Sequence, residues 1–275
     1  MEKDTLMDDE QMGYIELVNL RKEYKERRSV RRSHDDQEKK GDKLIALDGI
    51  DLEFKEGELV CILGPSGCGK STLLRLIAGF DQPTAGKVLV SGHEVVKPSS
   101  DSVFVFQQDG LLPWMTVWQN MELGLNHVSC KDEKAERVKE YIDLVELSGF
   151  ENNYPYQLSG GMKRRAELAR ALVVNPEMLM MDEPFTGLDF LTHMKMREEV
   201  VNMHEFIGKT MIMITHFIDD ALTMADRVVV LSERPTKVKM VRELNVQRPR
   251  NIERDPVLRE LRDEIYLMLG VSYVV

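Results

Sequence analysis

Residues 59–72 read LVCILGPSGCGKST, and this stretch determines the fold class that the sequence predicts. Residues 59–63 form an unbroken apolar run, which is typical of a strand buried on both faces of a parallel sheet. A glycine-rich turn follows, and a helix is predicted from about Lys70 to Ala78, ended by Gly79. A strand, a turn with the Gly-x-x-x-x-Gly-Lys-Ser pattern and a helix, in this order, predict a phosphate-binding loop.

The loop gathers the groups that a nucleoside triphosphate needs. Glycines let backbone N–H groups turn inward, and the helix N-terminus adds positive potential. Lys70 suits the terminal phosphates and the Ser71 hydroxyl suits Mg²⁺. The alternative, a turn that merely links a strand to a helix, is disfavoured by this context. We therefore expect a nucleotide to be bound by Gly64, Pro65, Ser66, Gly67, Cys68, Gly69, Lys70, Ser71 and Thr72.

Outward from the loop, apolar runs at 178–181, 210–214 and 228–231 alternate with helical segments. This alternation predicts a parallel α/β sheet. Helical spacing over 131–147 indicates a helical insert that interrupts the alternation. Strand-like runs near 14–20 and 50–54 indicate an antiparallel β portion near the N-terminus. A further helix is predicted to begin at Pro256, with Asp255 as its cap.

Composition narrows the class of protein. The 275 residues are 43% hydrophobic and 31% charged, the balance of a soluble globular protein. The 37 Lys and Arg against 47 Asp and Glu give a net charge of −10, which disfavours nucleic acid and anionic lipid as partners. No run approaches the ~18 apolar residues that span a membrane, and no secretory signal is recognised. Three cysteines without metal-ligand spacing favour the cytoplasm.

Two carboxylates, Asp182 and Glu183, follow the apolar run at 178–181. Ligands of open α/β sheets bind at the carboxyl ends of the strands. Asp182 therefore suits a Mg²⁺ site, and Glu183 suits a base that activates water. Such a pair can also be a solvated turn or a helix cap, but the phosphate loop nearby favours the site.

The sequence LSGGM at 158–162, followed by a helix rich in Arg and Ala, resembles the signature of ATP-binding-cassette (ABC) ATPases. The other motifs of that family stand in the same order. The phosphate loop comes first, then Gln107 at a strand end, LSGG, Asp182–Glu183, the sequence GLD at 187–189, and His216 after another strand. The resemblance covers about residues 14–232, and the other histidines, His34, His93, His127, His193 and His204, are expected to be ordinary polar residues.

The resemblance implies a P-loop NTPase parallel-sheet core with an antiparallel β subdomain and a helical insert subdomain. It implies ATP and Mg²⁺ as cofactors, catalytic roles for Glu183, His216 and Gln107, and metal ligands Ser71, Gln107 and Asp182. It also implies that Tyr24 stacks on adenine, although an aromatic residue in a strand is often part of the core. In the family a homodimer sandwiches ATP, and the residues that complete the partner's site here are Ser159, Gly160 and Gly161. The resemblance also implies that Asp189 binds the nucleotide.

The segments LLPW at 111–114 and YPYQLSGGM at 154–162 resemble the nitrate, sulfonate and taurine importer subgroup. This implies an ATPase subunit at the cytoplasmic face of the membrane, peripheral, which powers uptake of a small anion through integral membrane permease subunits. A solute-binding protein would belong to the same system. Met162 stands where the family commonly has Gln, and LLPW can instead pack internally. The alternative function is a soluble ABC ATPase with a regulatory role.

We expect an acidic extension at 1–13, an ATPase domain at 14–232 and a C-terminal tail with a helix at 233–275. Within the domain we expect a charged loop at 27–43 and a helical subdomain at about 111–172. Cys68 lies near a helix N-terminus, which lowers the pKa of a thiol. We therefore expect maleimide to modify Cys68 and ATP to protect it.

Overall fold

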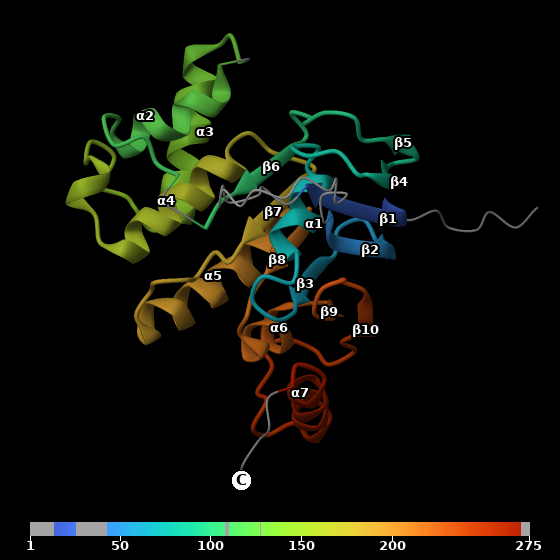
Figure 1. Cartoon of the computed structure of the whole chain (residues 1–275). Helices are drawn as coiled ribbons and strands as arrows, with labels where there is room; N and C mark the ends of the chain where they lie inside the picture. Colours follow the sequence, from blue (N-terminus) through green and yellow to red (C-terminus); the bar gives the residue numbers. More distant parts are fainter. Residues whose placement is uncertain (1–13, 26–42, 108–109, 127, 271–275) are drawn as a thin grey trace, which may run out of the picture.

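Figure 1 shows a computed structural model of the chain, which describes residues 14–25, 43–107, 110–126 and 128–270. Its centre is a six-stranded sheet in the order β10-β9-β3-β8-β7-β6. Strands β6, β7, β8, β3 and β9 are parallel, and β10 pairs antiparallel with β9. The bounds are β3 Leu59–Leu63, β6 Ser102–Val105, β7 Met178–Asp182, β8 Thr210–Ile214, β9 Arg227–Leu231 and β10 Val238–Glu243.

A second, four-stranded antiparallel sheet has the order β2-β1-β4-β5. Its strands are β1 Ile15–Lys25, β2 Lys43–Phe54, β4 Ala85–Val90 and β5 His93–Glu94. Because side chains alternate along a strand, Val60 and Ile62 of β3 pack toward this sheet and helix α1 (Lys70–Ile77). Leu59, Cys61 and Leu63 join the apolar cluster on the opposite face of β3. The core sheet is therefore covered on both faces, as its unbroken apolar strands require.

A group of helices stands to one side of the two sheets (Figure 1). It contains α2 Val117–Glu122, the short turn Leu123–Leu125, α3 Lys131–Leu144, the turn Pro155–Gln157 and α4 Gly160–Leu172. Helix α4 contacts α2 and α3 as well as β6 and α5, so it connects this group to the core. The predicted P-loop α/β fold with an antiparallel part and a helical insert is confirmed.

Three further helices, α5 Phe190–Ile207, α6 Ile218–Met224 and α7 Pro256–Met268, add to the lower face in Figure 1. Asp255 caps α7, as predicted, by accepting hydrogen bonds from the N–H groups of Val257 and Leu258. The expected boundary at residue 232 falls between β9 and β10, which form one hairpin of the core sheet. The segment after residue 232 thus supplies a strand of the core. No helix among the described ranges has the length and apolar character to cross a membrane.

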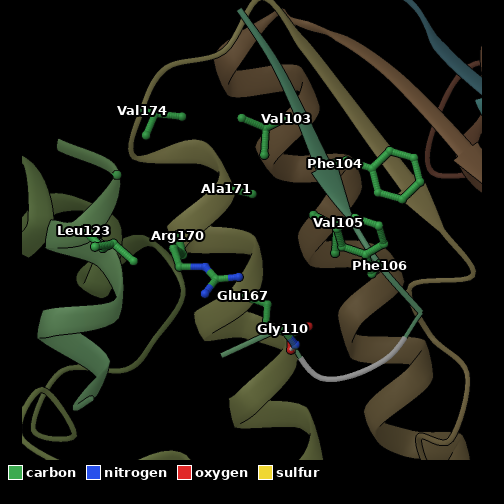
Figure 2. Close-up of a pocket in the computed structure, with 11 residues that line it drawn as sticks. Val103, Phe104, Val105, Phe106, Gly110, Leu123, Glu167, Arg170, Ala171 and Val174 are labelled. Atoms are coloured by element: carbon green, nitrogen blue, oxygen red, sulfur yellow. The ribbon is translucent and has the colours of Figure 1, made fainter. Parts of the chain in front are cut away.

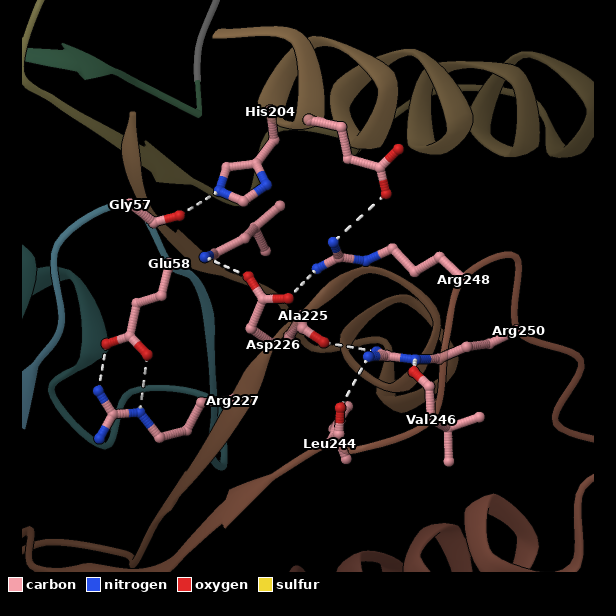
Figure 3. A network of polar contacts seen from close by, with 12 residues as sticks. Gly57, Glu58, His204, Ala225, Asp226, Arg227, Leu244, Val246, Arg248 and Arg250 are labelled. Carbon is pink, nitrogen blue, oxygen red and sulfur yellow. Dashed lines mark hydrogen bonds and ion pairs between the residues drawn. The ribbon is translucent and has the colours of Figure 1, made fainter. Parts of the chain in front are cut away.

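Polar side chains fix the C-terminal segment to the amino ends of the core strands (Figure 3). Glu58, just before β3, makes a two-bond ion pair with Arg227 at the start of β9. Asp226 accepts from the Leu59 amide at 2.8 Å and from Arg248 at 2.6 Å. Further carbonyls accept from the Arg250 guanidinium, namely those of Leu222, Ala225, Leu244 and Val246.

The acidic extension 1–13 and residues 27–42 of the expected charged loop lie outside the described residues. The division into domains therefore stays a prediction.

Candidate functional site

The phosphate loop joins β3 to α1. Gly67 and Gly69 have φ angles of 73° and 123°, in the region that favours glycine. A Cβ atom at Gly69 would also lie 3.1 Å from the Leu47 side chain, so β2 restricts the turn from outside. Gly69 is the N-cap of α1, and the first N–H groups of that helix have no partner within it. This backbone can cradle an anion.

Lys70 begins α1 and turns back over the loop. Its Nζ donates to the carbonyls of Gly64 at 2.7 Å and Pro65 at 3.1 Å, and the side chain is buried. An ammonium group has three N–H donors, so one remains for a phosphate oxygen. The buried positive charge and the helix N-terminus fit a triphosphate.

Asp182 ends β7 and receives a hydrogen bond from the Ser71 hydroxyl. Burial raises the pKa of Asp182, the Ser71 bond acts against that rise, and the neighbouring Glu183 adds to it. A hydroxyl and a carboxylate side by side are hard oxygen ligands of the kind that Mg²⁺ prefers. A cation held between them would oppose the effect of burial by favouring the ionised carboxylate. The residues present therefore fit Mg²⁺.

Three sequence-predicted catalytic residues meet at the carboxylate of Glu183. One oxygen, Oε2, lies 3.3 Å from Gln107 Nε2, 3.4 Å from His216 Nδ1 and 3.2 Å from the Thr186 hydroxyl. Gln107 follows β6, Glu183 follows β7 and His216 follows β8, so adjacent parallel strands deliver all three. The φ angle of Glu183 is 49°, which is rare for a residue with a side chain and recurs at functional sites. Its amide donates to Ile214 at 3.0 Å, which holds this conformation.

The signature residues lie elsewhere. Ser159 caps α4 by accepting from the Met162 amide at 3.3 Å. A Cβ atom at Gly161 would lie 2.4 Å from the Thr192 side chain, so glycine is needed where α4 approaches α5. Ser159 opens a helix of the helical group, whereas Lys70 opens α1 against the two sheets (Figure 1). One chain thus presents two helix N-termini that could bind an anion, one beside the two sheets and one in the helical group.

Asp189 caps α5 by accepting from the Thr192 amide at 3.1 Å. Its bonds to Thr192 lower the pKa of the Asp189 carboxyl. Tyr24, near the end of β1, is 38% exposed and reaches the phosphate-loop side, where its hydroxyl donates to Asp81 at 3.1 Å and lies 3.5 Å from Thr72. The Nζ of Lys22 lies over the Tyr24 ring, 5.2 Å from its centroid. The stacking of adenine on Tyr24 stays a prediction.

The sequence did not reveal a buried ion pair that lies next to the backbone of the site. Arg164 and Glu167, one turn apart on α4, bond to each other. Arg164 also donates to the carbonyl of Phe106 at 3.1 Å and to that of Pro184, and Glu167 accepts from the Gly110 amide. The pair therefore ties the backbone on both sides of Gln107, and next to Glu183, to the helical group. The Arg-x-x-Glu spacing on a helix was the available signal.

A cavity of about 250 Å³ adjoins this pair (Figure 2). It lies between β6 and α4, with Phe106, Glu167 and Arg170 on its wall. Nearby, Leu111 is buried and belongs to the core, so the internal alternative is right for this residue. Trp114, in contrast, is 68% exposed.

The expectation that the helix N-terminus lowers the pKa of the Cys68 thiol is wrong. The side chain is buried, and burial raises the pKa of its thiol, outweighing the lowering by Lys70. Position at a helix N-terminus does not suffice when the sulfur is shielded from water.

Comparisons with known proteins agree on one family. The family model described as "ABC transporter" matches residues 47–186. An aliphatic sulfonates import ATP-binding protein of Bacillus thuringiensis is 41% identical over 206 residues, covering 74% of this chain and 81% of the relative. A nitrate import ATP-binding protein of Synechocystis sp. is 42% identical over 235 residues, covering 82% and 88%. A solved dimeric ATP-binding cassette in a post-hydrolysis state with ADP and Pi has a TM-score of 0.68 and 32% identity, covering 85% of this chain and 100% of that one.

Proposed function

This chain belongs to the ABC transporter family, binds ATP with Mg²⁺ and hydrolyses ATP, and on that premise we propose that it powers uptake of a small oxyanion through separate permease subunits. The observation that carries the proposal is the meeting of Gln107 and His216 at Glu183 beside the phosphate loop. The import functions named for both relatives favour transport over a regulatory role.

Within the site, Glu183 acts as the base that orients and deprotonates the attacking water. Gln107 and His216 both contact Oε2 of this carboxylate, at 3.3 and 3.4 Å. Lys70 and the N–H groups of the loop hold the phosphates, and Tyr24 stacks on the base. Mg²⁺, bound by Ser71, Asp182 and Gln107, would neutralise negative charge on the phosphates.

The working form is a homodimer that encloses ATP. The N-termini of α1 and α4 lie in different parts of the chain, so a phosphate at Gly64–Ser71 of one subunit meets Ser159, Gly160 and Gly161 of the other. The dimeric form of the solved cassette supports this arrangement. Two subunits of charge −10 repel each other, and bound nucleotide supplies the bridging contacts.

The helical subdomain, at about 111–172, carries the contact with the permease at the cytoplasmic face of the membrane. Trp114 is exposed on the loop before α2, close along the chain to Gln107. Exposed aromatic residues are frequent interface anchors. The names of the relatives support a sulfonate or nitrate-like solute, delivered by a solute-binding protein of the same system.

Light scattering on Glu183→Gln with and without ATP tests the dimer. We expect a dimer with ATP and a monomer without it, since this variant retains the nucleotide. A monomer in both conditions would contradict the sandwich.

Membranes that carry the permease test the transport role. We expect Trp114→Ala to leave basal ATP hydrolysis intact and to uncouple it from uptake. Tyr156→Ala, which removes another exposed aromatic ring, is the matched control. Unchanged coupling in Trp114→Ala would contradict the docking role.

A further inference from the structure

Four rings stand in series from Phe185, in the loop after Glu183, to His216. The ring of His193 lies 5.3 Å from that of Phe185 and 4.9 Å, edge-on, from that of Phe217. The ring of Phe217 in turn lies 4.0 Å from that of His216. The side chain of His193, the fourth residue of α5, therefore supports the ring that packs on His216.

His193 is itself held by α6. Its Nε2 lies 2.8 Å from Oδ2 of Asp220, in the first turn of α6. Asp220 is buried, and its other oxygen lies 3.6 Å from Arg197, one turn after His193 on α5. Both contacts to this carboxylate come from one face of α5. The His193–Asp220 contact thus joins α5 to α6, which begins at Ile218, two residues after His216.

We propose that His193 is a positioning residue of ATP hydrolysis: through Asp220 and Phe217 it holds the His216 ring beside the Glu183 carboxylate. The proposal rests on the proposed role of His216. It links two elements of the site that are distant in sequence. Helix α5 follows its N-cap Asp189, a predicted nucleotide-binding residue, and α6 begins at Ile218, two residues after His216. His193 touches no reacting atom, so its loss should change turnover and leave nucleotide affinity intact.

The test compares His193→Ala with His193→Gln in steady-state ATP hydrolysis. Gln places an N–H donor near the position of Nε2 and can keep the bond to Asp220. We expect kcat to fall about tenfold in the alanine variant and less than about threefold in the glutamine variant, with KM for ATP unchanged in both. Equal losses in both variants, a raised KM with normal kcat, or no loss in either would overturn the proposal.

A matched control separates positioning from folding. His204 is a second histidine on α5 and is buried, but its Nε2 lies 3.0 Å from the Gly57 carbonyl oxygen, away from the site. We expect His204→Gln to lower the melting temperature and leave kcat of the folded protein unchanged. A loss of kcat in His204→Gln equal to that in His193→Ala would overturn the proposal, because any disturbance of α5 would then suffice.

His216→Ala distinguishes this inference from the function on which it rests. If His193 acts through His216, the double variant His193→Ala/His216→Ala should be no slower than His216→Ala alone. Normal hydrolysis by His216→Ala would contradict the proposed role of His216 itself. A slow His216→Ala together with a normal His193→Ala would contradict the positioning role only.

Discussion

The polar side chains at the two ends of the parallel core strands differ in burial and in the length of their contacts. At the carboxyl ends, Glu183 and His216 are partly exposed, and the contacts of the Glu183 carboxylate are 3.2 to 3.4 Å long. At the amino ends, Glu58 and Arg227 are buried and share two hydrogen bonds (Figure 3). The first group can exchange its partners for a ligand, whereas the second holds the sheet to the segment that follows it. The proposed catalytic residues therefore lie at the carboxyl ends of the parallel strands, and the stabilising ion pair lies at their amino ends.

The largest effect is expected at the carboxyl end. Glu183→Gln removes the proposed base but keeps the shape of the side chain, so hydrolysis should fall ~10²- to 10⁴-fold, the size of a general-base contribution. Phosphate release measures the rate, and fluorescent ATP measures binding, which should be retained. Hydrolysis at a near-normal rate would show that Glu183 is not the base, and would contradict a catalytic role for the carboxyl ends of the strands.

The amino end should respond in stability instead. Arg227→Met leaves the buried Glu58 carboxylate without its partner, which costs ~3–5 kcal/mol of unfolding free energy. Urea denaturation measures the loss, and hydrolysis per folded molecule should stay normal. The double variant Glu58→Leu/Arg227→Met should recover most of the stability, because no charge is then left buried.

An exposed ion pair at the same end supplies the control for Arg227→Met. Lys55 and Glu243 form such a pair at 2.6 Å, with side chains 60% and 55% exposed. Lys55→Ala should change stability little. An equal loss in Lys55→Ala and Arg227→Met would show that burial does not distinguish the two pairs.

A smaller effect concerns pH. Burial lowers the pKa of His204 from its usual 6.5, so the unfolded chain binds that proton more readily than the folded chain. Its contribution to stability is present above pH 6.5 and is lost as the pH falls from 6.5 through the lower folded pKa, by at most about 1.4 kcal/mol per pH unit. Urea denaturation should be measured at pH values between 7.5 and 5.5, about one unit above and below the pKa of a free histidine. The unfolding free energy should change less with pH in His204→Gln than in the unsubstituted protein. Identical slopes would rule His204 out.

The smallest effect is expected in thiol labelling. Cys130 is exposed, whereas Cys61 and Cys68 are buried and burial raises the pKa of both thiols. Maleimide should modify one thiol per folded chain, with or without ATP, and Cys130→Ser should abolish it. Labelling of Cys68 that ATP prevents would show that the carboxyl end is more open than the structure has it.

Local chemistry explains what the sequence predicts well. The phosphate loop and the pair Asp182–Glu183 follow apolar runs directly, so the strands that carry them are evident along the chain. Gln107 and His216 needed the family resemblance, because the meeting of their side chains at Glu183 depends on strand order.

Contacts between distant elements escaped prediction for a physical reason. The roles of the pairs Arg164–Glu167 and His193–Asp220 depend on the backbone and rings packed around them. Those neighbours come from distant segments, so the local sequence spacing does not reveal them. Cys68 was mispredicted because a helix N-terminus is visible in sequence, whereas the burial that outweighs it is not.

Strand β6, which precedes Gln107, is the least constrained of the strands that carry the site. Among the described strands it lies at the edge of the six-stranded sheet and pairs over four residues with β7 only, whereas β3, β7 and β8 have neighbours on both sides. A force that displaces Gln107 therefore strains one ladder of hydrogen bonds, and a force on Glu183 strains two. The site is mechanically asymmetric, with compliance on the side where the helical group and Trp114 join it. Amide hydrogens of β6 should accordingly exchange faster than those of β3.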